Sequence, residues 1–278
     1  VIMMNNPSAL CFGEILFDVF GDDRCIGGAP FNFAAHFAQL GGEAVMVSAV
    51  GDDELGKEAI EYTRRYGISD AFVSTAHGVP TATVRVTLKD GSPSYEFGKD
   101  VSYDHIRVPA IKKTYNMLYF GTLAQRADDS ETALDALLCS RAGEENFFDV
   151  NIRKTGCGAE RISELLEYTT ILKFSREEAS ALGGGDLDAL CRSLADAHRN
   201  IKLIIVTLDR DGSFVYDTKA REFRFSRRPR STVVSTVGAG DGYSARFMYD
   251  YLRGRPIDEC IENATKLAER ICGQKGAI

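Results

Sequence analysis

A glycine-rich stretch near the C-terminal end holds the residues best suited to catalysis. It reads Gly238-Ala239-Gly240-Asp241, and an amphipathic helical pattern follows over 243–252. Because glycine is unfavourable inside helices and strands, we expect a turn that leads into a helix N-terminus. Unpaired N–H groups and the helix dipole favour an anion such as phosphate there, with Asp241 beside it as a proton acceptor. The same pattern also occurs in tight connections that bind nothing, so the rest of the chain has to decide.

Other polar residues follow predicted strands or precede predicted helices. Ligands of open parallel sheets bind at the carboxyl ends of the strands, so these residues are expected to meet at one edge. Asp18 could accept a hydrogen bond from a substrate hydroxyl there, and the Asn32 amide could both donate to and accept from a polyol. The groups concerned are Asp18, 28–32, 151–153, 175–178, 207–212 and 238–241.

Several of these residues also have a purely structural interpretation. Asp18 could be a turn or cap residue, and Asn32 could cap the helix that has Pro30 in its first turn. Ser175 and Glu178 have the spacing of a capping box, in which each side chain bonds to the backbone N–H of the other residue. The sequence by itself leaves both interpretations open.

Strands and helices alternate along most of the chain, which predicts an α/β fold with a largely parallel sheet. Two segments differ, because 81–88 and 94–97 alternate with period two and Asp90-Gly91 between them is a hairpin signal. We interpret this hairpin as a flap that can cover a ligand, with Arg85 on one of its strands. The other strands are expected at 9–13, 44–50, 117–120, 146–150, 170–174, 201–208, 213–216 and 222–225.

The composition excludes several classes of protein. A net charge of -7 argues against a large nucleic-acid interface, which needs clustered positive charge. The 7 cysteines, without a C-x-x-C motif, indicate neither a disulfide framework nor a zinc site and suggest a reducing compartment. No apolar run approaches the roughly 20 residues that span a membrane, and no signal-peptide pattern is present, so we expect a cytoplasmic protein without a membrane partner. An NAD-dependent enzyme is disfavoured, because the glycine motif comes late and the dinucleotide fingerprint is missing.

The order and spacing of the polar groups resemble the ribokinase (PfkB) family of carbohydrate kinases over essentially the whole chain. Two remote signatures carry the resemblance, one formed by 27–32 with 51–56 and the other by 236–241. Within the family, the chain is most similar to bacterial fructokinases, on the segments 80–82, 90–91, 95–97 and 149–153.

This resemblance implies a fold and a reaction. The fold would be a single ribokinase-like α/β domain over 1–278, a Rossmann-type three-layer α/β/α sandwich with a small antiparallel β-lid formed by 18–27 and 80–100. The reaction would be transfer of the γ-phosphoryl group of Mg·ATP to a hydroxyl of a monosaccharide. Fructose is the expected acceptor, with 2-keto-3-deoxygluconate, ribose or a nucleoside as alternatives. A homodimer formed through the lid is a further implication.

The resemblance also implies residue roles. Asp241 would be the catalytic base, and the N–H groups of Gly238, Ala239 and Gly240 would hold the transferring phosphoryl group. Glu178 would place Mg²⁺, through water. The residues expected to contact the sugar are Asp18, Gly28 and Asn32, with Arg85 from the lid as a further candidate, and Asn151 and Arg153 at the gap between sugar and phosphate. Those expected along the nucleotide are Thr207, Asp209, Gly212, Gly238, Gly240 and Asn263.

Four features depart from the family pattern. Ser235 replaces an aspartate that supports a monovalent cation, which leaves activation by potassium (K⁺) open. Ser175 stands in place of an asparagine, and Asp209 in place of a glycine, where its charge should repel the ATP phosphates. The chain stops at 278, where family members usually continue, so part of the nucleotide pocket wall is expected to be absent. These departures motivate a second hypothesis, a carbohydrate-binding or regulatory protein that has lost efficient catalysis.

Overall fold

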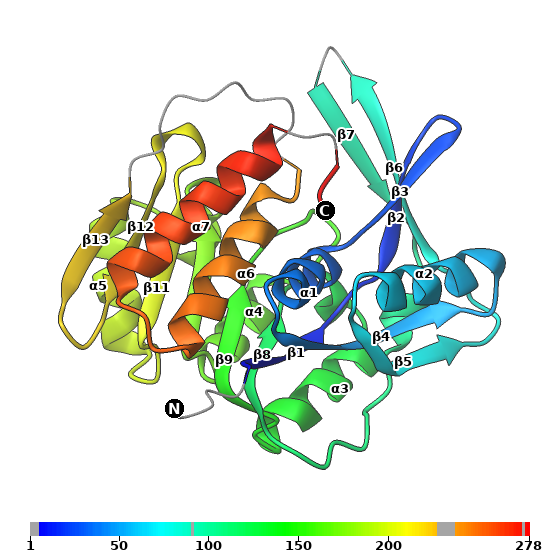
Figure 1. Cartoon of the computed structure of the whole chain (residues 1–278), viewed down its shortest axis with the longest axis horizontal. Coiled ribbons are helices and arrows are strands. Elements are labelled where there is room, and N and C mark those ends of the chain that lie inside the picture. Colours follow the sequence, from blue (N-terminus) through cyan, green and yellow to red (C-terminus); the bar gives the residue numbers. More distant parts are fainter. Residues whose placement is uncertain (1–5, 90–91, 227–236, 274–275) are drawn as a thin grey trace.

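A nine-stranded sheet forms the centre of the molecule in the computed structural model, which describes residues 6–89, 92–226, 237–273 and 276–278. The strand order is β13-β12-β11-β10-β9-β8-β1-β4-β5 (Figure 1). Neighbouring strands pair in parallel except for the two antiparallel pairs β11–β12 and β12–β13. The strands are β1 Ser8–Phe12, β4 Glu43–Gly51, β5 Ser69–Ala76, β8 Tyr115–Phe120, β9 Gly143–Asp149, β10 Ile171–Ser175, β11 Leu203–Thr207, β12 Ser213–Asp217 and β13 Glu222–Ser226.

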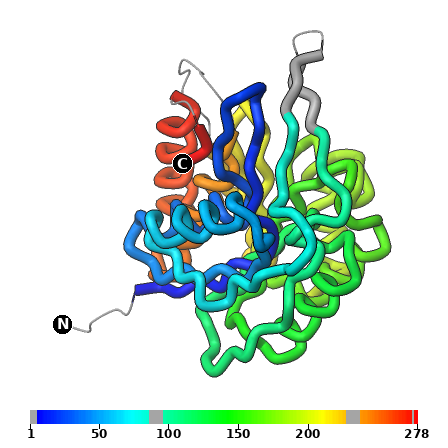
Figure 2. Tube along the Cα trace, turned by 90° about the vertical axis from the view of Figure 1, so that its right-hand side faces the viewer, coloured from blue at the N-terminus to red at the C-terminus, as the bar shows by residue number. Residues whose placement is uncertain are grey.

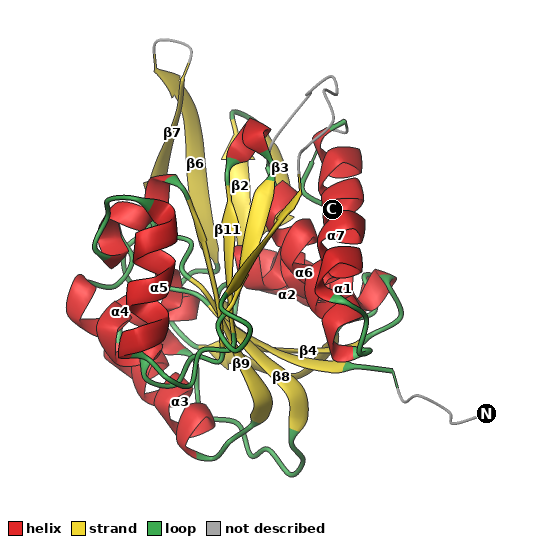
Figure 3. Ribbon diagram, turned by 90° about the vertical axis from the view of Figure 1, so that its left-hand side faces the viewer, coloured by secondary structure: helices red, strands yellow, loops and turns green. Residues whose placement is uncertain are grey.

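Helices cover both faces of this sheet (Figure 3). One face carries α1 Ala29–Gln39, α2 Glu54–Arg65, α6 Ala239–Leu252 and α7 Ile257–Cys272. The other face carries α3 Asp128–Cys139, α4 Ala159–Leu166 and α5 Leu187–Ala197. Short 3₁₀ segments, η1 Ser102–His105, η2 Leu123–Arg126, η3 Glu177–Leu182 and η4 Asp209–Asp211, complete the connections.

The sheet separates two apolar cores. On β1, Leu10 and Phe12 pack into one core, whereas Ala9 and Cys11 pack into the other. This division follows from the alternation of side chains along a strand, and it requires both faces of the strand to be apolar. The predicted three-layer α/β/α sandwich is therefore confirmed.

A second sheet of four strands, in the order β3-β2-β6-β7, stands away from the main body (Figures 1 and 2). It consists of β2 Leu16–Phe20, β3 Asp23–Gly27, β6 Ala82–Lys89 and β7 Ser92–Phe97, and we call it the lid. The predicted antiparallel pairing holds for β2–β3 and β6–β7, but β2 and β6 are parallel. The reason is that both strands rise from the same edge of the main sheet. The predicted turn residues Asp90 and Gly91 lie outside the described residues.

One signature of the sequence anchors the base of the lid. The Asp53 carboxylate accepts hydrogen bonds from the N–H of Gly56, at 2.8 Å, and from the N–H and hydroxyl of Thr81, at 2.9 and 2.6 Å. The Thr81 hydroxyl in turn accepts from the Gly51 N–H at 2.9 Å. Residue 56 must be glycine, because a Cβ there would lie 2.1 Å from the Gly51 carbonyl oxygen. The segment 51–56 therefore fixes the chain just before β6 and does not line the cavity described below.

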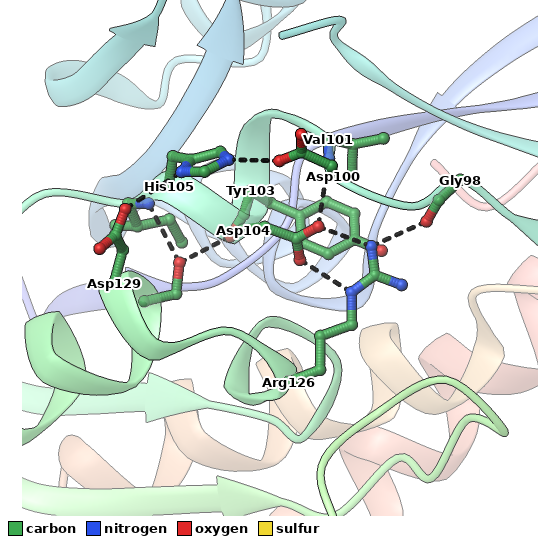
Figure 4. A network of polar contacts seen from close by, with 10 residues as sticks. Gly98, Asp100, Val101, Tyr103, Asp104, His105, Arg126 and Asp129 are labelled. Carbon is green, nitrogen blue, oxygen red and sulfur yellow. Dashed lines mark hydrogen bonds and ion pairs between the residues drawn. The ribbon is translucent and has the colours of Figure 1, made fainter.

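A second anchor holds the other end of the lid (Figure 4). The Arg126 guanidinium donates to both Asp104 carboxylate oxygens at 2.8 Å, to the Gly98 carbonyl oxygen at 2.8 Å, and lies over the Tyr103 ring at 4.8 Å. Since Gly98 directly follows β7, this contact ties the last lid strand to η1. Both ends of the β6–β7 hairpin are thus held by buried or part-buried polar contacts.

Two local features differ from the sequence prediction. Strand β5 was not expected, because it is an edge strand whose side chains are mostly part-exposed and show weak apolar periodicity. The capping-box spacing of Ser175 and Glu178 predicts the start of a helix, but the structure has there the short 3₁₀ segment η3, which is followed by three consecutive glycines, 183–185, all with positive φ. Within the described ranges, no helix combines the length and apolar character needed to cross a bilayer.

Candidate active site

A cavity of about 350 Å³ lies between the lid and the carboxyl edge of the main sheet. This volume falls within the range of roughly 300–1,000 Å³ that is typical of small-molecule sites. The lid contributes Leu16, Asp18, Val84 and Phe97. The main body contributes Glu14, Gly28, Ala29, Asn32, Leu123, Asn151, Arg153, Lys173, Val237, Gly238, Gly240 and Asp241.

The cavity brings together most of the residues predicted to contact a sugar. Asp18, Gly28, Asn32, Asn151 and Arg153 all line it, although they come from three separate segments of the chain.

Arg85 does not line this cavity. It is exposed beside the buried, cavity-lining Val84. Adjacent residues of a strand face opposite sides of the sheet, so Val84 faces the cavity and Arg85 points away from it.

The glycine-rich turn has the predicted geometry. Gly238 has a left-handed backbone with φ of 77° and begins α6 without a side-chain cap. A side chain there would be strained, and its Cβ would lie 2.5 Å from the Ala277 Cα. The first N–H groups of α6 have no partner within the helix, so they and the helix dipole are available to an anion.

Asp241 lies in the first turn of α6 and faces the cavity. Its Oδ2 accepts a hydrogen bond from Asn32 Nδ2 at 2.8 Å, which links α6 to α1 across 209 residues of sequence. Burial raises the pKa of Asp241 to about 7, and the nearby Asp149 adds to this rise, while the hydrogen bond from Asn32 opposes it. A carboxyl group with a pKa near neutrality is suited to general base catalysis.

Two more acidic groups share this environment with Asp241. Glu14 is 4% exposed, and its carboxylate accepts from the Ala29 N–H at the start of α1 at 3.3 Å. Burial raises the pKa of Glu14 to about 7, and burial also raises the pKa of Asp18. Arg153 lowers the pKa of all three carboxyl groups, so it is a shared countercharge in the cavity.

A buried ion pair lies beside the glycine-rich turn. Lys173 Nζ lies 2.9 Å from both carboxylate oxygens of Asp149, and the Tyr119 hydroxyl donates to the same carboxylate at 3.2 Å. Although burial disfavours the ammonium, Asp149 raises the pKa of Lys173 above its ordinary value, so Lys173 stays charged. Its Nζ would lie 3.6 Å from a Cβ at Gly240, which places a cation beside the glycine turn.

A second cavity, of about 230 Å³, lies on the other side of that turn. The predicted nucleotide residues Thr207, Asp209, Gly212 and Gly240 line it, together with Ala239 from the predicted phosphate-binding turn. Residues that the sequence analysis did not assign to it are Ser175, Glu177, Ser213, Tyr243, Thr265, Ala268 and Cys272.

Asn263 is not part of this cavity. It lies on α7, where its amide donates to the buried Asp250 carboxylate of α6 at 2.9 Å. Thr265 and Ala268 line the cavity instead, because they occupy another side of the same helix.

Asp209 occupies the position where the resemblance leads us to expect glycine. Its φ is 51°, a left-handed conformation that favours glycine, and Asp209 lines the second cavity, as Glu177 does. Two acidic side chains therefore border the space predicted for a polyphosphate.

Both carboxylate oxygens of Glu178 accept hydrogen bonds from backbone N–H groups. Its two carboxylate oxygens accept from the Ile152 N–H at 2.7 Å and from the Ser175 N–H at 2.8 Å, and the Glu178 N–H donates to the Ser175 hydroxyl at 3.3 Å. The capping-box interpretation of Ser175 and Glu178 is thus confirmed. The part of the chain that the structure describes contains no cluster of three His, Cys, Asp or Glu able to hold a metal ion. These residues therefore fit a Mg²⁺ ion that is bound mainly by phosphate oxygens and water and makes few direct bonds to the protein.

Two structural alternatives for the sugar-side residues are wrong. Asp18 lies within β2 and is not a turn residue. Gly28 is the N-cap of α1, which has no side-chain cap, and the Asn32 amide bonds to Asp241 instead. Sequence reasoning also missed Glu14 and Lys173. The signal was present, because an isolated acidic or basic residue beside a buried strand seldom occurs without a partner or a role.

Gly240 lines both cavities, whereas Asp241 lines only the cavity under the lid. The two cavities thus meet at the N-terminus of α6, with the Asp241 carboxyl group on one side of the glycine-rich turn. This arrangement on this fold defines the class of ribokinase-like carbohydrate kinases.

The chain belongs to the pfkB family of carbohydrate kinases, because the sequence model of this family matches residues 8–278. It is 28% identical to probable fructokinase-5 of Arabidopsis thaliana, over 99% of this chain and 94% of that protein. It is also 28% identical to aminoimidazole riboside kinase of Salmonella typhimurium, over 92% of this chain and 84% of that protein. Among solved structures, Vibrio cholerae fructokinase with bound fructose, ADP and calcium ion gives a TM-score of 0.86 at 20% identity, covering 98% of this chain and 94% of that one.

Proposed function

We propose that this carbohydrate kinase transfers the γ-phosphoryl group of ATP to a hydroxyl of fructose. The observation that carries the proposal is the position of Gly240, which belongs to the walls of both cavities, with Asp241 on the lid side. A sugar under the lid and a nucleotide in the second cavity would face each other across the N–H groups of the turn. The relatives named fructokinase support fructose as the sugar.

The proposed step balances as follows. The acceptor hydroxyl oxygen forms a bond to the γ-phosphorus, the bond from that phosphorus to the β–γ bridging oxygen breaks, and ADP leaves. The hydroxyl proton passes to the Asp241 carboxylate. The N–H groups of Gly238, Ala239 and Gly240 would stabilise charge on the transferring group, with the Lys173 ammonium close to Gly240.

The acidic character of the sugar cavity favours a neutral polyol. Glu14, Asp18 and Asp241 offer acceptors for hydroxyl groups, and Arg153 balances only part of their charge. A sugar acid such as 2-keto-3-deoxygluconate would add a further negative charge, which costs free energy in a partly desolvated site. Ribose and nucleosides remain the alternatives with neutral hydroxyl groups.

The proposal includes a Mg²⁺ ion bound to ATP, whereas it makes no claim about potassium. Mg²⁺ bound to ATP would neutralise phosphate charge, and Glu178 is proposed to orient its water ligands. The two carboxylates at the nucleotide cavity, Glu177 and Asp209, make such neutralisation more important. Ser235, on which the expectation about potassium rests, lies outside the described residues.

The test is a coupled assay of ADP release with Mg·ATP and a panel of fructose, ribose, 2-keto-3-deoxygluconate, mannose, glucose and adenosine. Turnover on fructose, reduced about 10²–10⁴-fold by Asp241→Asn, is the expected result. Turnover on another member would replace fructose but keep the mechanism. If the variant retained the wild-type rate, Asp241 would not be the base.

A second candidate is a sugar-binding homologue with weakened catalysis. The observation that favours it is the pair of carboxylates, Glu177 and Asp209, at the nucleotide cavity. Calorimetry distinguishes the two proposals, because sugar binding without any binding of Mg·ATP would support the binding protein and exclude the kinase.

Assembly and location stay predictions. The lid carries the exposed Phe20, 46% accessible, which supports a homodimer that pairs through the lid. Light scattering at micromolar concentration should give twice the mass of one chain, and a monomer would remove this idea. All 7 cysteines are unpaired, which supports a reducing, cytoplasmic location.

A further inference from the structure

His36 is a buried polar side chain that the proposed mechanism does not use. It lies on α1, is 5% exposed and lines neither of the two cavities. Its Nε2 lies 2.8 Å from the Ala277 carbonyl oxygen, across 241 residues of sequence. About one helical turn separates His36 from Asn32, which bonds to Asp241. The same side of α1 thus makes two polar contacts around the start of α6.

The chemistry of this contact fixes the state of the histidine. A carbonyl oxygen only accepts hydrogen bonds, so Nε2 must carry a proton and donate it to Ala277. Burial lowers the pKa of His36, so the ring is neutral at neutral pH and Nε2–H is its single N–H donor. Loss of this donor would leave a part-buried carbonyl oxygen without its hydrogen bond, which costs free energy.

The segment that His36 holds lies directly against the glycine-rich turn. A Cβ at Gly238 would lie 2.5 Å from the Ala277 Cα and 2.6 Å from the Ala277 carbonyl oxygen. A Cβ at Gly242, in the first turn of α6, would lie 3.5 Å from His36 Nε2. Ile278 continues this packing, since it lies part-buried against the apolar core to which α1 and α6 contribute. Ala277 is therefore held between His36 on α1 and Gly238 at the start of α6.

A turn made of glycine gains most from such a contact. Gly238 has a φ of 77°, and α6 begins there without a side-chain cap. Because glycine adopts left-handed and right-handed conformations about equally readily, its own chemistry does not select one of them. N–H groups that stabilise a transferring phosphoryl group act best when they are fixed before the ligand arrives. A contact that keeps Gly238 in its left-handed conformation would preorganise these groups.

We propose that His36 is a positioning residue, which holds the Ala277 backbone against Gly238 and so fixes the glycine-rich turn. The expected effect on the rate rests on the proposed function, whereas the effect on the turn does not. Since His36 lines neither cavity, it acts through the backbone of the turn and not through a contact with the sugar. Its loss should therefore lower the rate and leave sugar binding unchanged.

Two substitutions separate the N–H donor from the volume of the side chain. His36→Leu keeps a side chain of similar size without an N–H, whereas His36→Gln keeps an amide N–H at about the same reach. With Mg·ATP and the sugar, His36→Leu should lower kcat about tenfold or more and leave KM for the sugar within about twofold. His36→Gln should retain most of kcat. Equal losses of kcat in both variants, or a KM for the sugar that rises as much as kcat falls, would overturn the inference.

Hydrogen exchange of the ligand-free protein gives a readout without turnover. Mass spectrometry of the peptide 238–246 follows the opening of the first turn of α6, where the Gly242 N–H donates to the Gly238 carbonyl oxygen at 2.9 Å. Exchange there should be about tenfold faster in His36→Leu and close to wild type in His36→Gln. Peptides from α3 and β10 should be unchanged, which excludes a general loss of stability.

This readout keeps the inference separate from the proposed function. If the wild type turned over no sugar, the proposed function would fail, but faster exchange confined to the turn in His36→Leu would still support the role of His36. Unchanged exchange at 238–246 in His36→Leu would overturn that role, even if sugar turnover had been demonstrated.

A control histidine lies on the other face of the main sheet. His198 Nδ1 lies 2.9 Å from Glu167 Oε1 at the end of α5. His198→Leu thus repeats the loss of a histidine contact away from the glycine-rich turn. It should change neither kcat nor the exchange of the peptide 238–246. If this control loosened the turn as much as His36→Leu does, the effect would not belong to the contact with Ala277, and the inference would be overturned.

Discussion

Replacement of the proposed base should remove activity and, at alkaline pH, make the protein more stable. Folding raises the pKa of Asp241 from 3.8 to about 7, chiefly through burial. The folded state thus binds the proton more tightly than the unfolded state, and stability falls as pH rises from about 4 to about 7. At 1.36 kcal/mol per pH unit, ionised Asp241 costs about 4 kcal/mol at pH 8.

Asp241→Asn removes this charge but keeps an oxygen that can accept from Asn32. The buried amide offsets part of the gain, since an unpaired polar group costs about 2 kcal/mol, so we expect a net stabilisation of about 2 kcal/mol at pH 8. Between pH 8 and pH 5 the advantage should fall by about 3 kcal/mol, because wild-type Asp241 becomes protonated. The wild type should then be the more stable protein at pH 5.

Urea unfolding at pH 8 and pH 5 measures this change of sign. Glu14 is present in both proteins, so its own raised pKa cancels to first order in the comparison. Asp196→Asn is a suitable control, because Asp196 is exposed, pairs with Arg221 at 3.1 Å and has a lowered pKa. That control should not stabilise the protein at either pH. Equal stability of Asp241→Asn and wild type at both pH values would refute the argument from burial.

Three further changes test other parts of the site. Asp209→Gly should lower KM for ATP and leave KM for the sugar unchanged, because it removes a carboxylate and relaxes a φ of 51°. Asp209→Asn, measured in the same rate assay, removes the charge but keeps the strained backbone, so it separates the two effects. Gly28→Ala should lower the free energy of unfolding by about 1–3 kcal/mol, since φ is 107° and a Cβ would lie 2.5 Å from the Glu14 carbonyl oxygen; Gly158→Ala, with open space around it, is the control in thermal unfolding. Asp53→Ala removes the hydrogen bonds to Thr81 at the base of the lid and should raise KM for the sugar more than it lowers kcat; an unchanged KM would mean that the lid does not depend on this anchor.

The local pattern of the sequence was sufficient for the buried strands of the main sheet and for the glycine-rich turn before α6. Strands buried on both faces are continuous apolar runs, and the small residues before Asp241 restrict that stretch to a turn at a helix start. The hairpin at 81–97 was equally readable from its period-two alternation. Each of these signals acts over a few residues, so it is visible without the fold.

Other features depended on contacts between distant segments. No local pattern shows that Asn32 would meet Asp241 across 209 residues, or that Lys173 would pair with Asp149 instead of reaching solvent. Three further features are likewise consequences of packing. Strand β2 pairs in parallel with β6, and Arg85 on β6 is exposed and does not line the cavity. The Asn263 amide donates to Asp250 and does not line the second cavity. The sequence by itself determined the class of fold and the turn that begins α6, because these follow from local backbone preference and periodicity. The tertiary structure decided which acids are buried, which partners hold them and which residues face each cavity, because burial and charge pairing exist only once the two cores have closed around the sheet.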